Sequence, residues 1–152
     1  FENFTYYGKG PFENYADRKE GALIGLYKQT VDEQYFPYGK PQTTGNKSDV
    51  RWSMLSNESV GLAVYGYPYY ETAALHFEEN DLWKKSGSEV KKRDEIYWHI
   101  DIQQSGLGGA SCGPGVRQNY IVPVKNYNYS VVLKPVDLKQ ENPNELQIAL
   151  PR

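Results

Sequence analysis

Cysteine, histidine and aspartate side chains in the last third of the chain could together perform nucleophilic catalysis. A thiolate nucleophile needs an adjacent base, and the base needs a group that orients it. His99 and Asp101 alternate on one face of an expected strand, but no spacing places Cys112 or the second histidine, His76, beside them. We therefore interpret His99 and Asp101 as supporting residues of a surface or an interface.

Paired carboxylates would indicate a different chemistry, the hydrolysis of glycosidic bonds. Such sites hold two carboxyl groups about 5 to 10 Å apart, one of them usually in an apolar setting that raises its pKa. Most acids of this chain stand in turns and hydrophilic stretches, whereas Asp101 lies within a strand pattern between the apolar residues Ile100 and Ile102. One carboxylate is not a pair, so we expect no catalytic residue and no hydrolysis by this chain alone.

A glycine-rich segment, residues 106–114 with the sequence GLGGASCGP, follows the strongest strand pattern of the chain. Its glycines permit positive φ angles and let backbone N–H groups come close to a partner. No helical pattern follows it, so it does not match a dinucleotide-binding turn. The residue types alone fit a structural turn and a ligand-facing loop equally well.

Strand patterns dominate the elements that must position these residues. Residues 96–103 alternate cleanly between apolar and polar side chains. The β-rich segments 50–55 and 60–65 predict a hairpin closed by the polar residues 56–59.

A second hairpin is expected from 120–124 and 129–134, joined by 125–128. Pro123 cannot donate a ladder hydrogen bond, so it marks an edge position, a bulge or the end of the strand. The remaining expected elements are two strands and one short helical segment: 20–28, 69–77 and 79–85.

Closely spaced strands with Gly, Pro and Asn turns and little helix predict an all-β fold, an antiparallel β-sandwich. We expect residues 1–135 to form this domain and residues 136–152, which are polar and rich in Pro and Asn, to form a C-terminal tail.

Composition indicates no nucleic-acid or membrane partner. The formal net charge is −2 and the pI is about 5.7, and no apolar run is long enough to cross a bilayer. A single cysteine supports neither an internal disulfide nor a zinc site. The 14 tyrosines suit both half-buried sheet surfaces and sugar binding. We expect a water-soluble protein of the cytoplasm or the periplasm.

Three motifs in order carry a resemblance to a known family. They are residues 10–18 (GPFENYADR), residues 38–52 (YGKPQTTGNKSDVRW) and the glycine-rich segment 106–114. Together they resemble the C-terminal domain, the small-chain or domain 5 type, of the β-galactosidases of glycoside hydrolase family 2.

This resemblance implies a large supersandwich related to galactose mutarotase, with additional strands preceding Phe1, so that the chain is part of a larger domain. It implies a parent enzyme that hydrolyses terminal β-D-galactosides with retention, with its catalytic glutamates in a (β/α)₈ barrel that nothing here can build. Magnesium and sodium would be used in other domains, with no metal site and no cofactor here. The implied partners are the barrel, the other domains and the galactoside; exposed sheet edges also suggest a second copy of the chain.

The resemblance also implies roles for individual residues. The glycine-rich loop would reach over the barrel mouth and help to close the substrate pocket, through Gly108, Gly109, Ser111 and Cys112. Some family members carry a sugar-stacking tryptophan where this chain has Cys112, which is too small to stack. Residues expected to be structural or to contact other domains are Glu13, Asn14, Asp17, Arg18 and Arg51.

Two alternatives from other functional classes remain open. A free-standing carbohydrate-binding module is supported by the tyrosine excess. A mutarotase-like aldose epimerase would need a histidine and a glutamate that line one face of a sheet.

Overall fold

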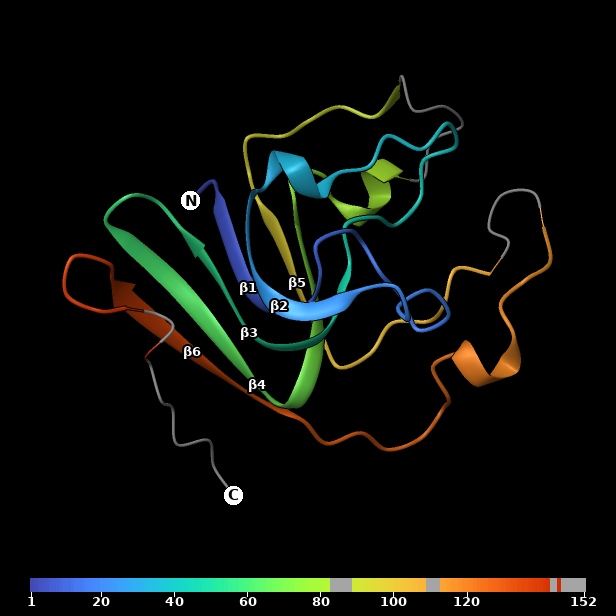
Figure 1. Cartoon of the computed structure of the whole chain (residues 1–152). Helices are drawn as coiled ribbons and strands as arrows, with labels where there is room; N and C mark the ends of the chain where they lie inside the picture. Colours follow the sequence, from blue (N-terminus) through green and yellow to red (C-terminus); the bar gives the residue numbers. More distant parts are fainter. Residues whose placement is uncertain (83–88, 109–112, 143–144, 146–152) are drawn as a thin grey trace.

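The computed structural model describes residues 1–82, 89–108, 113–142 and 145. The strands among these residues form one curved antiparallel sheet (Figure 1). The strands are β1 (Asn3–Gly10), β2 (Leu23–Thr30), β3 (Lys47–Ser56), β4 (Val60–Leu75), β5 (Tyr97–Asp101) and β6 (Ser130–Asp137). Short 3₁₀ turns occur at Asp32–Gln34, Glu79–Leu82 and Gln118–Tyr120, and the described residues contain no α-helix. The predicted all-β, antiparallel class is confirmed, and the open sheet is consistent with a β-sandwich type of domain.

Strand β4 pairs with three other strands of the sheet. The strand order is β2-β1-β3-β4-β5, and β6 also pairs with β4. One edge of β4 pairs with β3. Its other edge pairs first with β6, through residues 60–67, and then with β5, through residues 71–75. Figure 1 shows β4 turning sharply between these two partners.

The bend of β4 depends on a close approach at Gly66. A Cβ at Gly66 would lie 2.2 Å from the ring of Tyr70, so only glycine lets this ring pack into the bend. The Tyr70 hydroxyl then donates to the carbonyl of Val64 at 3.1 Å and lies 2.6 Å from Ser53 Oγ. The strand segments 60–65 and 69–77 that the sequence predicts are therefore one bent strand.

The predicted hairpin 50–65 is confirmed as β3 and β4. Asn57 closes it, because its side-chain oxygen accepts hydrogen bonds from the backbone N–H groups of Ser59 at 2.8 Å and Val60 at 2.9 Å. The predicted strands 20–28 and 96–103 are also present, as β2 and β5, with bounds shifted by a few residues.

Two apolar clusters lie on opposite faces of the sheet. The larger contains Phe4, Tyr6, Val64 and Tyr70, all essentially inaccessible to solvent, with Trp98 packed against it. The smaller gathers four buried residues: Met54, Ala63, Tyr65 and Val136. Burial on both faces explains why β4 reads as a nearly continuous apolar run.

The predicted second hairpin, 120–134, is wrong. Residues 118–120 form a 3₁₀ turn, 121–129 join no ladder, and β6 pairs with β4. Pro123 lacks a donor, and both Ile121 and Val124 are exposed, so neither of these two side chains is buried against the sheet.

Two other predicted segments extend beyond the described residues. The helical segment 79–85 begins as the 3₁₀ turn Glu79–Leu82, and residues 83–88 are not described. Strand β6 continues to Asp137, two residues past the predicted domain boundary, and Val136 is buried there. Most of the C-terminal tail, residues 143–144 and 146–152, is not described.

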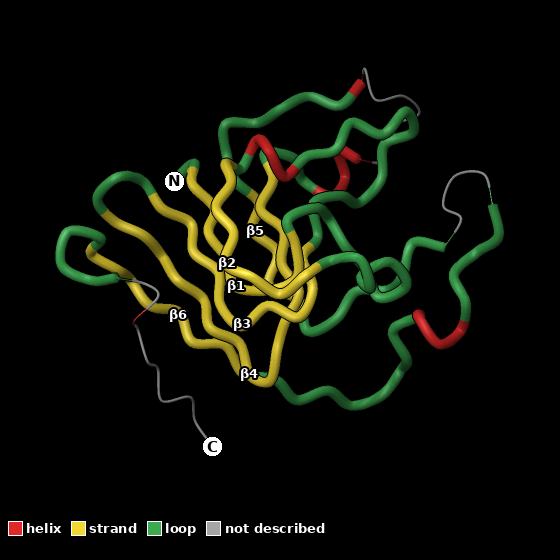
Figure 2. Tube along the Cα trace, in the orientation of Figure 1, coloured by secondary structure: helices red, strands yellow, loops and turns green. Residues whose placement is uncertain are grey.

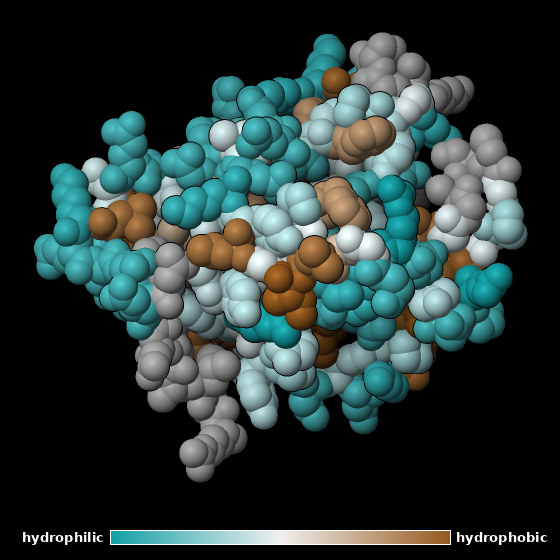
Figure 3. Space-filling view, in the orientation of Figure 1, coloured by the Kyte–Doolittle hydropathy of each residue, from teal (hydrophilic) through white to brown (hydrophobic). Residues whose placement is uncertain are grey.

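The edge strand β2 exposes apolar side chains. Leu23, Ile24 and Leu26 are all exposed, and Figure 3 shows apolar side chains gathered over β2 on the drawn face. Across the described part of the chain, no helix combines the length and the apolar character needed to traverse a bilayer.

The long connections gather on one side of the sheet, as Figure 2 shows. They include residues 11–22, here called the strap, residues 31–46, and the segment that follows β5. All three motifs singled out in the sequence lie in or next to these connections.

Candidate functional site

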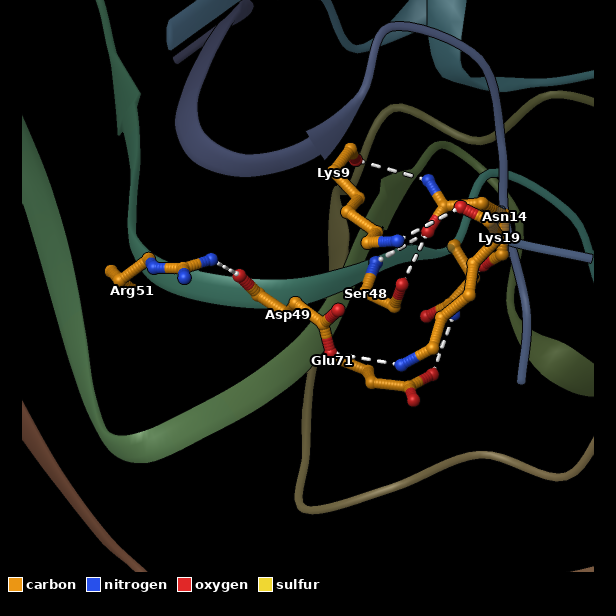
Figure 4. A network of polar contacts seen from close by, with 8 residues as sticks. Lys9, Asn14, Lys19, Ser48, Asp49, Arg51 and Glu71 are labelled. Carbon is orange, nitrogen blue, oxygen red and sulfur yellow. Dashed lines mark hydrogen bonds and ion pairs between the residues drawn. The ribbon is translucent and has the colours of Figure 1, made fainter. Parts of the chain in front are cut away.

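Asn14, in the strap, is the centre of a buried polar network. Its side-chain nitrogen donates to the carbonyls of Lys9 and Phe12, each at 3.0 Å. Its side-chain oxygen accepts from the backbone N–H of Ser48 at 3.0 Å and from the Ser48 hydroxyl. Because Asn14 is fully buried, these four bonds satisfy an amide that would otherwise be costly to bury. Figure 4 shows Asn14 pointing at the bulged part of β3.

Glu13, next to Asn14, ties the strap to the connection before β3. Its carboxylate accepts from the Thr44 hydroxyl and the Gly45 N–H, both at 2.9 Å, and from the hydroxyls of Tyr15 and Tyr38. The first and second sequence motifs are therefore bonded directly to each other.

Asp49 occupies an irregular position in β3. It has a positive φ of 51°, and the β3–β4 register shifts between Lys47 and Val50, where it lies, and again between Val50 and Trp52. Its carboxylate binds the Lys19 ammonium at 3.0 Å, and its carbonyl accepts from the Arg51 guanidinium. The Arg51 guanidinium lies 4.3 Å from the ring centre of Tyr69, in cation–π range. The bulge thus directs Asp49 toward the strap.

Asp17, at the far end of the first motif, binds the glycine-rich segment. Its two carboxylate oxygens accept from the backbone N–H groups of Leu107 at 3.0 Å and Gly108 at 2.7 Å. A Cβ at Gly106 would lie 2.4 Å from the Asp17 carboxyl carbon. Only glycine at position 106 leaves room for this approach. We call residues 106–108 the loop stem.

The loop stem is also held from its other side. The Gly106 N–H donates to the carbonyl of Tyr120 at 2.8 Å. Gly108 has a φ of +62°, and a Cβ there would lie 2.7 Å from the backbone nitrogen of Val116. The stem is therefore a close-packed structure, and its glycines are required by backbone angle and by contact.

Glu71, on β4, is a buried carboxylate that the sequence reasoning missed. Its Oε2 accepts from the Asn46 side-chain nitrogen at 2.7 Å, and the backbone N–H of Gln104 also donates to it. Burial raises the pKa of Glu71 to about 7, and these two hydrogen bonds oppose the rise. The one sequence signal was that Glu71 is the only acidic residue between Val60 and Phe77.

A polar hollow of about 190 Å³ lies beside Glu71, with Lys19, Asp49 and Gln103 in its lining. Figure 4 shows Lys19 reaching toward Asp49 beside Glu71. The hydrogen bonds of Glu71 indicate that its carboxylate holds the start of the segment after β5.

Lys47 is a second buried charged residue that the sequence reasoning missed. Its ammonium donates to the carbonyl of Gly45 at 3.0 Å, and its side chain is only 2% exposed. Burial lowers the pKa of Lys47 to about 8, and the nearby Glu13 carboxylate partly counters this. No pattern around Lys47 distinguishes it from the exposed lysines of the chain.

His99 and Asp101 do lie near each other on β5. His99 Nδ1 is 4.0 Å from Asp101 Oδ2, and that same oxygen accepts from the Gln104 side chain at 2.8 Å. Cys112, Ser111 and Gly109 lie outside the described residues. The contribution of Cys112 to this site, and the proposed pocket role of these loop residues, therefore stay predictions.

His76 follows β4 and is buried. Its Nε2 lies 2.9 Å from Glu2 Oε2, and its Nδ1 lies 3.2 Å from the carbonyl of Glu95. Both ring nitrogens already contact oxygen atoms. A mutarotase-like epimerase would need a histidine and a glutamate together. His76 and Glu2 are adjacent, but the His76 side chain is only 3% exposed.

Arg18 is exposed and makes no ion pair with the described residues. It lines a groove of about 320 Å³ together with Glu13 and Tyr38. No three His, Cys, Asp or Glu side chains gather into a metal-binding group in the parts of the chain that the structure describes.

Comparison with known proteins gives consistent matches along most of the chain. The family model described as the beta galactosidase small chain matches residues 1–133. A beta-galactosidase of Priestia megaterium is 36% identical over 140 residues, which cover 90% of this chain and 14% of the relative. A beta-galactosidase of Pseudoalteromonas haloplanktis is 38% identical over 131 residues, or 85% of this chain and 12% of the relative. The chain therefore spans only 12 to 14% of the length of these curated relatives.

Proposed function

Because the chain belongs to the beta galactosidase small-chain family, we propose that it is the C-terminal accessory domain of an enzyme that hydrolyses terminal β-D-galactosides. The observation that carries this proposal is the match over residues 1–133 to relatives that are named beta-galactosidases and are much longer than this chain. In this proposal the catalytic barrel, and the magnesium and sodium ions of the parent enzyme, belong to other domains.

The chemistry we assign to the parent enzyme is retaining hydrolysis. Two carboxylates of the barrel act on the glycosidic bond, one as nucleophile and one as acid and then base. This domain contributes shape to the pocket. The glycine-rich loop, from Gly108 through Gly109, Ser111 and Cys112, closes over the bound galactoside and packs on the barrel. Exclusion of water by such a closure strengthens the electrostatic interactions inside a site.

The arrangement of Glu71 supports the inactivity of this chain alone. Glu71 has the raised pKa of a general acid, but protein donors already occupy its carboxylate. Purified chain should not hydrolyse a chromogenic β-galactoside. Turnover that disappears in the Glu71→Gln variant would contradict this and would assign catalysis to the chain itself.

A loop deletion tests the accessory role in the full-length protein that carries this chain. Removal of residues 107–113 should lower kcat/KM for a β-galactoside while the thermal unfolding midpoint of the barrel stays nearly unchanged. Cys112→Trp should alter galactoside affinity, or the ratio of transfer to hydrolysis, more than it alters folding. If the deletion leaves galactoside kinetics intact, the loop is only a turn and the pocket role is wrong.

A further inference from the structure

We propose that Asp17 is a positioning residue that fixes the loop stem from which the glycine-rich loop continues, a role that rests on the proposed function of that loop. The proposal starts from the pairing of two motifs that are far apart in the sequence. Asp17 and Leu107 are 90 residues apart, and a carboxylate of the strap binds two successive backbone N–H groups of the loop stem.

Both oxygens of the Asp17 carboxylate take part in the contact with the loop stem. Each oxygen of Asp17 accepts from a different N–H, with distances of 3.0 and 2.7 Å. Hydrogen bonds to an ionised acceptor are about twice as strong as neutral ones. The missing side chain at Gly106 makes the approach possible, because a Cβ there would meet all three carboxyl atoms at 2.4 to 2.7 Å.

The strap that carries Asp17 is itself held on both sides of this residue. Asn14 holds it to Ser48 on β3, and Lys19 holds it through the ion pair with Asp49. Asp17 lies between these two attachments. The Asp17 carboxylate therefore extends from a backbone segment that is restrained on both sides, and such restraint preorganises a site.

Glu71 provides a second anchor where the segment leaves β5. It is the β4 partner of Asp101 at the end of β5 and shares the lining of the polar hollow with Gln103, and hydrogen bonding from the backbone of Gln104, two residues before the loop stem, opposes the rise of its pKa. The segment is thus held by Glu71 on the sheet and by Asp17 on the strap. The geometry of residues 104–108 is decided by side chains from elsewhere in the chain, which is what a loop with a defined direction needs.

The test compares Asp17→Asn with a matched variant, Glu13→Gln, in the full-length protein. Asparagine has the shape of aspartate but offers one acceptor oxygen and one NH₂ donor, so it cannot present a separate oxygen to each N–H group, and its NH₂ would face one of the two donors. Glu13 is a carboxylate of the same motif that binds Thr44 and Gly45 and does not contact the loop stem. Asp17→Glu, which keeps two acceptor oxygens, is the conservative variant.

Two measurements are made on each variant. The first is backbone hydrogen exchange at Leu107 and Gly108, which should become about 10- to 100-fold faster in Asp17→Asn. The second is steady-state hydrolysis of a β-galactoside, where misplacement of the loop should lower kcat/KM about 10- to 100-fold, mainly through KM. Asp17→Glu should recover part of both effects. Glu13→Gln, which removes a contact of the strap but none of the loop stem, should change both much less than Asp17→Asn does.

The outcomes separate the two proposals. Unchanged exchange at Leu107 and Gly108 in Asp17→Asn overturns the anchor. Faster exchange with unchanged galactoside kinetics overturns the positioning role. An equal kinetic loss in Glu13→Gln shows a general structural effect and also overturns it. If the full-length protein has no galactosidase activity at all, the proposed function fails, and the exchange result still decides whether Asp17 holds the loop stem.

Discussion

Replacement of Glu71 by glutamine should remove a specific pH dependence from the stability of the chain. The pKa of Glu71 is raised by burial from 4.5 to about 7 in the folded chain. Between these two values the folded chain binds more protons than the unfolded chain, so the free energy of unfolding falls as pH rises. The contribution of Glu71 is fully present below pH 4.5 and is lost as pH rises through about 7.

The size of this effect follows from the pKa shift. A rise from 4.5 to about 7 corresponds to about 3 kcal/mol at 1.36 kcal/mol per pKa unit. Glutamine does not titrate, so the difference in unfolding free energy between the wild-type chain and Glu71→Gln should shift by about this amount across the window. Lys47, with a pKa lowered to about 8, is present in both proteins and cancels in the difference.

Urea denaturation followed by tryptophan fluorescence at pH 5, 6, 7 and 8 measures this difference. The wild-type chain should lose stability relative to Glu71→Gln as pH rises. Equal differences at pH 5 and pH 8 would refute the reasoning, because they would mean that Glu71 titrates alike in the folded and unfolded chains. A slope of opposite sign would mean that its hydrogen bonds outweigh its burial.

Two further predictions concern the polar network. Gly106→Ala should displace the Asp17 carboxylate, because the new Cβ would lie 2.4 Å from its carboxyl carbon; we expect a loss of about 3 kcal/mol in urea denaturation. Gly115→Ala, whose Cβ would meet nothing within 4 Å, is the control, and an equal loss in both variants would contradict the contact. Asn14→Ala should also cost about 3 kcal/mol, because it leaves the buried Ser48 N–H and the carbonyls of Lys9 and Phe12 without this partner; a change below experimental error would show that water replaces the amide.

The strands that the sequence predicted are those with a strong local pattern. The alternation of 96–103 and the polar turn at Asn57 depend on neighbours in sequence, and both are present in the fold. The hairpin 120–134 failed because local β propensity does not specify a partner. The register of β6 is decided by β4, which precedes it by more than fifty residues.

The candidate site was only partly predictable for a related reason. Glycines and motif order marked the loop and the strap, but the contact between Asp17 and Leu107 cannot be inferred from spacing. The raised pKa of Glu71 depends on its burial in the folded chain, where its hydrogen-bond and charge partners come from four different segments, so its sequence signal was a lone acid in an apolar run. Conformation can be predicted locally here, whereas electrostatics requires the tertiary structure.

The large sequence separation between Asp17 and the loop stem also affects the order in which the parts of the chain fold. The β3–β4 hairpin closes through residues 57–59, whereas the Asp17 contact closes 90 residues. Distant contacts are formed only after enough native structure exists to offset their loop-closure entropy. The loop stem should therefore be among the last parts to become native during folding. A chain with a complete sheet would still lack an anchored loop stem, so in the proposed parent enzyme activity would report the final step of maturation rather than the formation of the sheet.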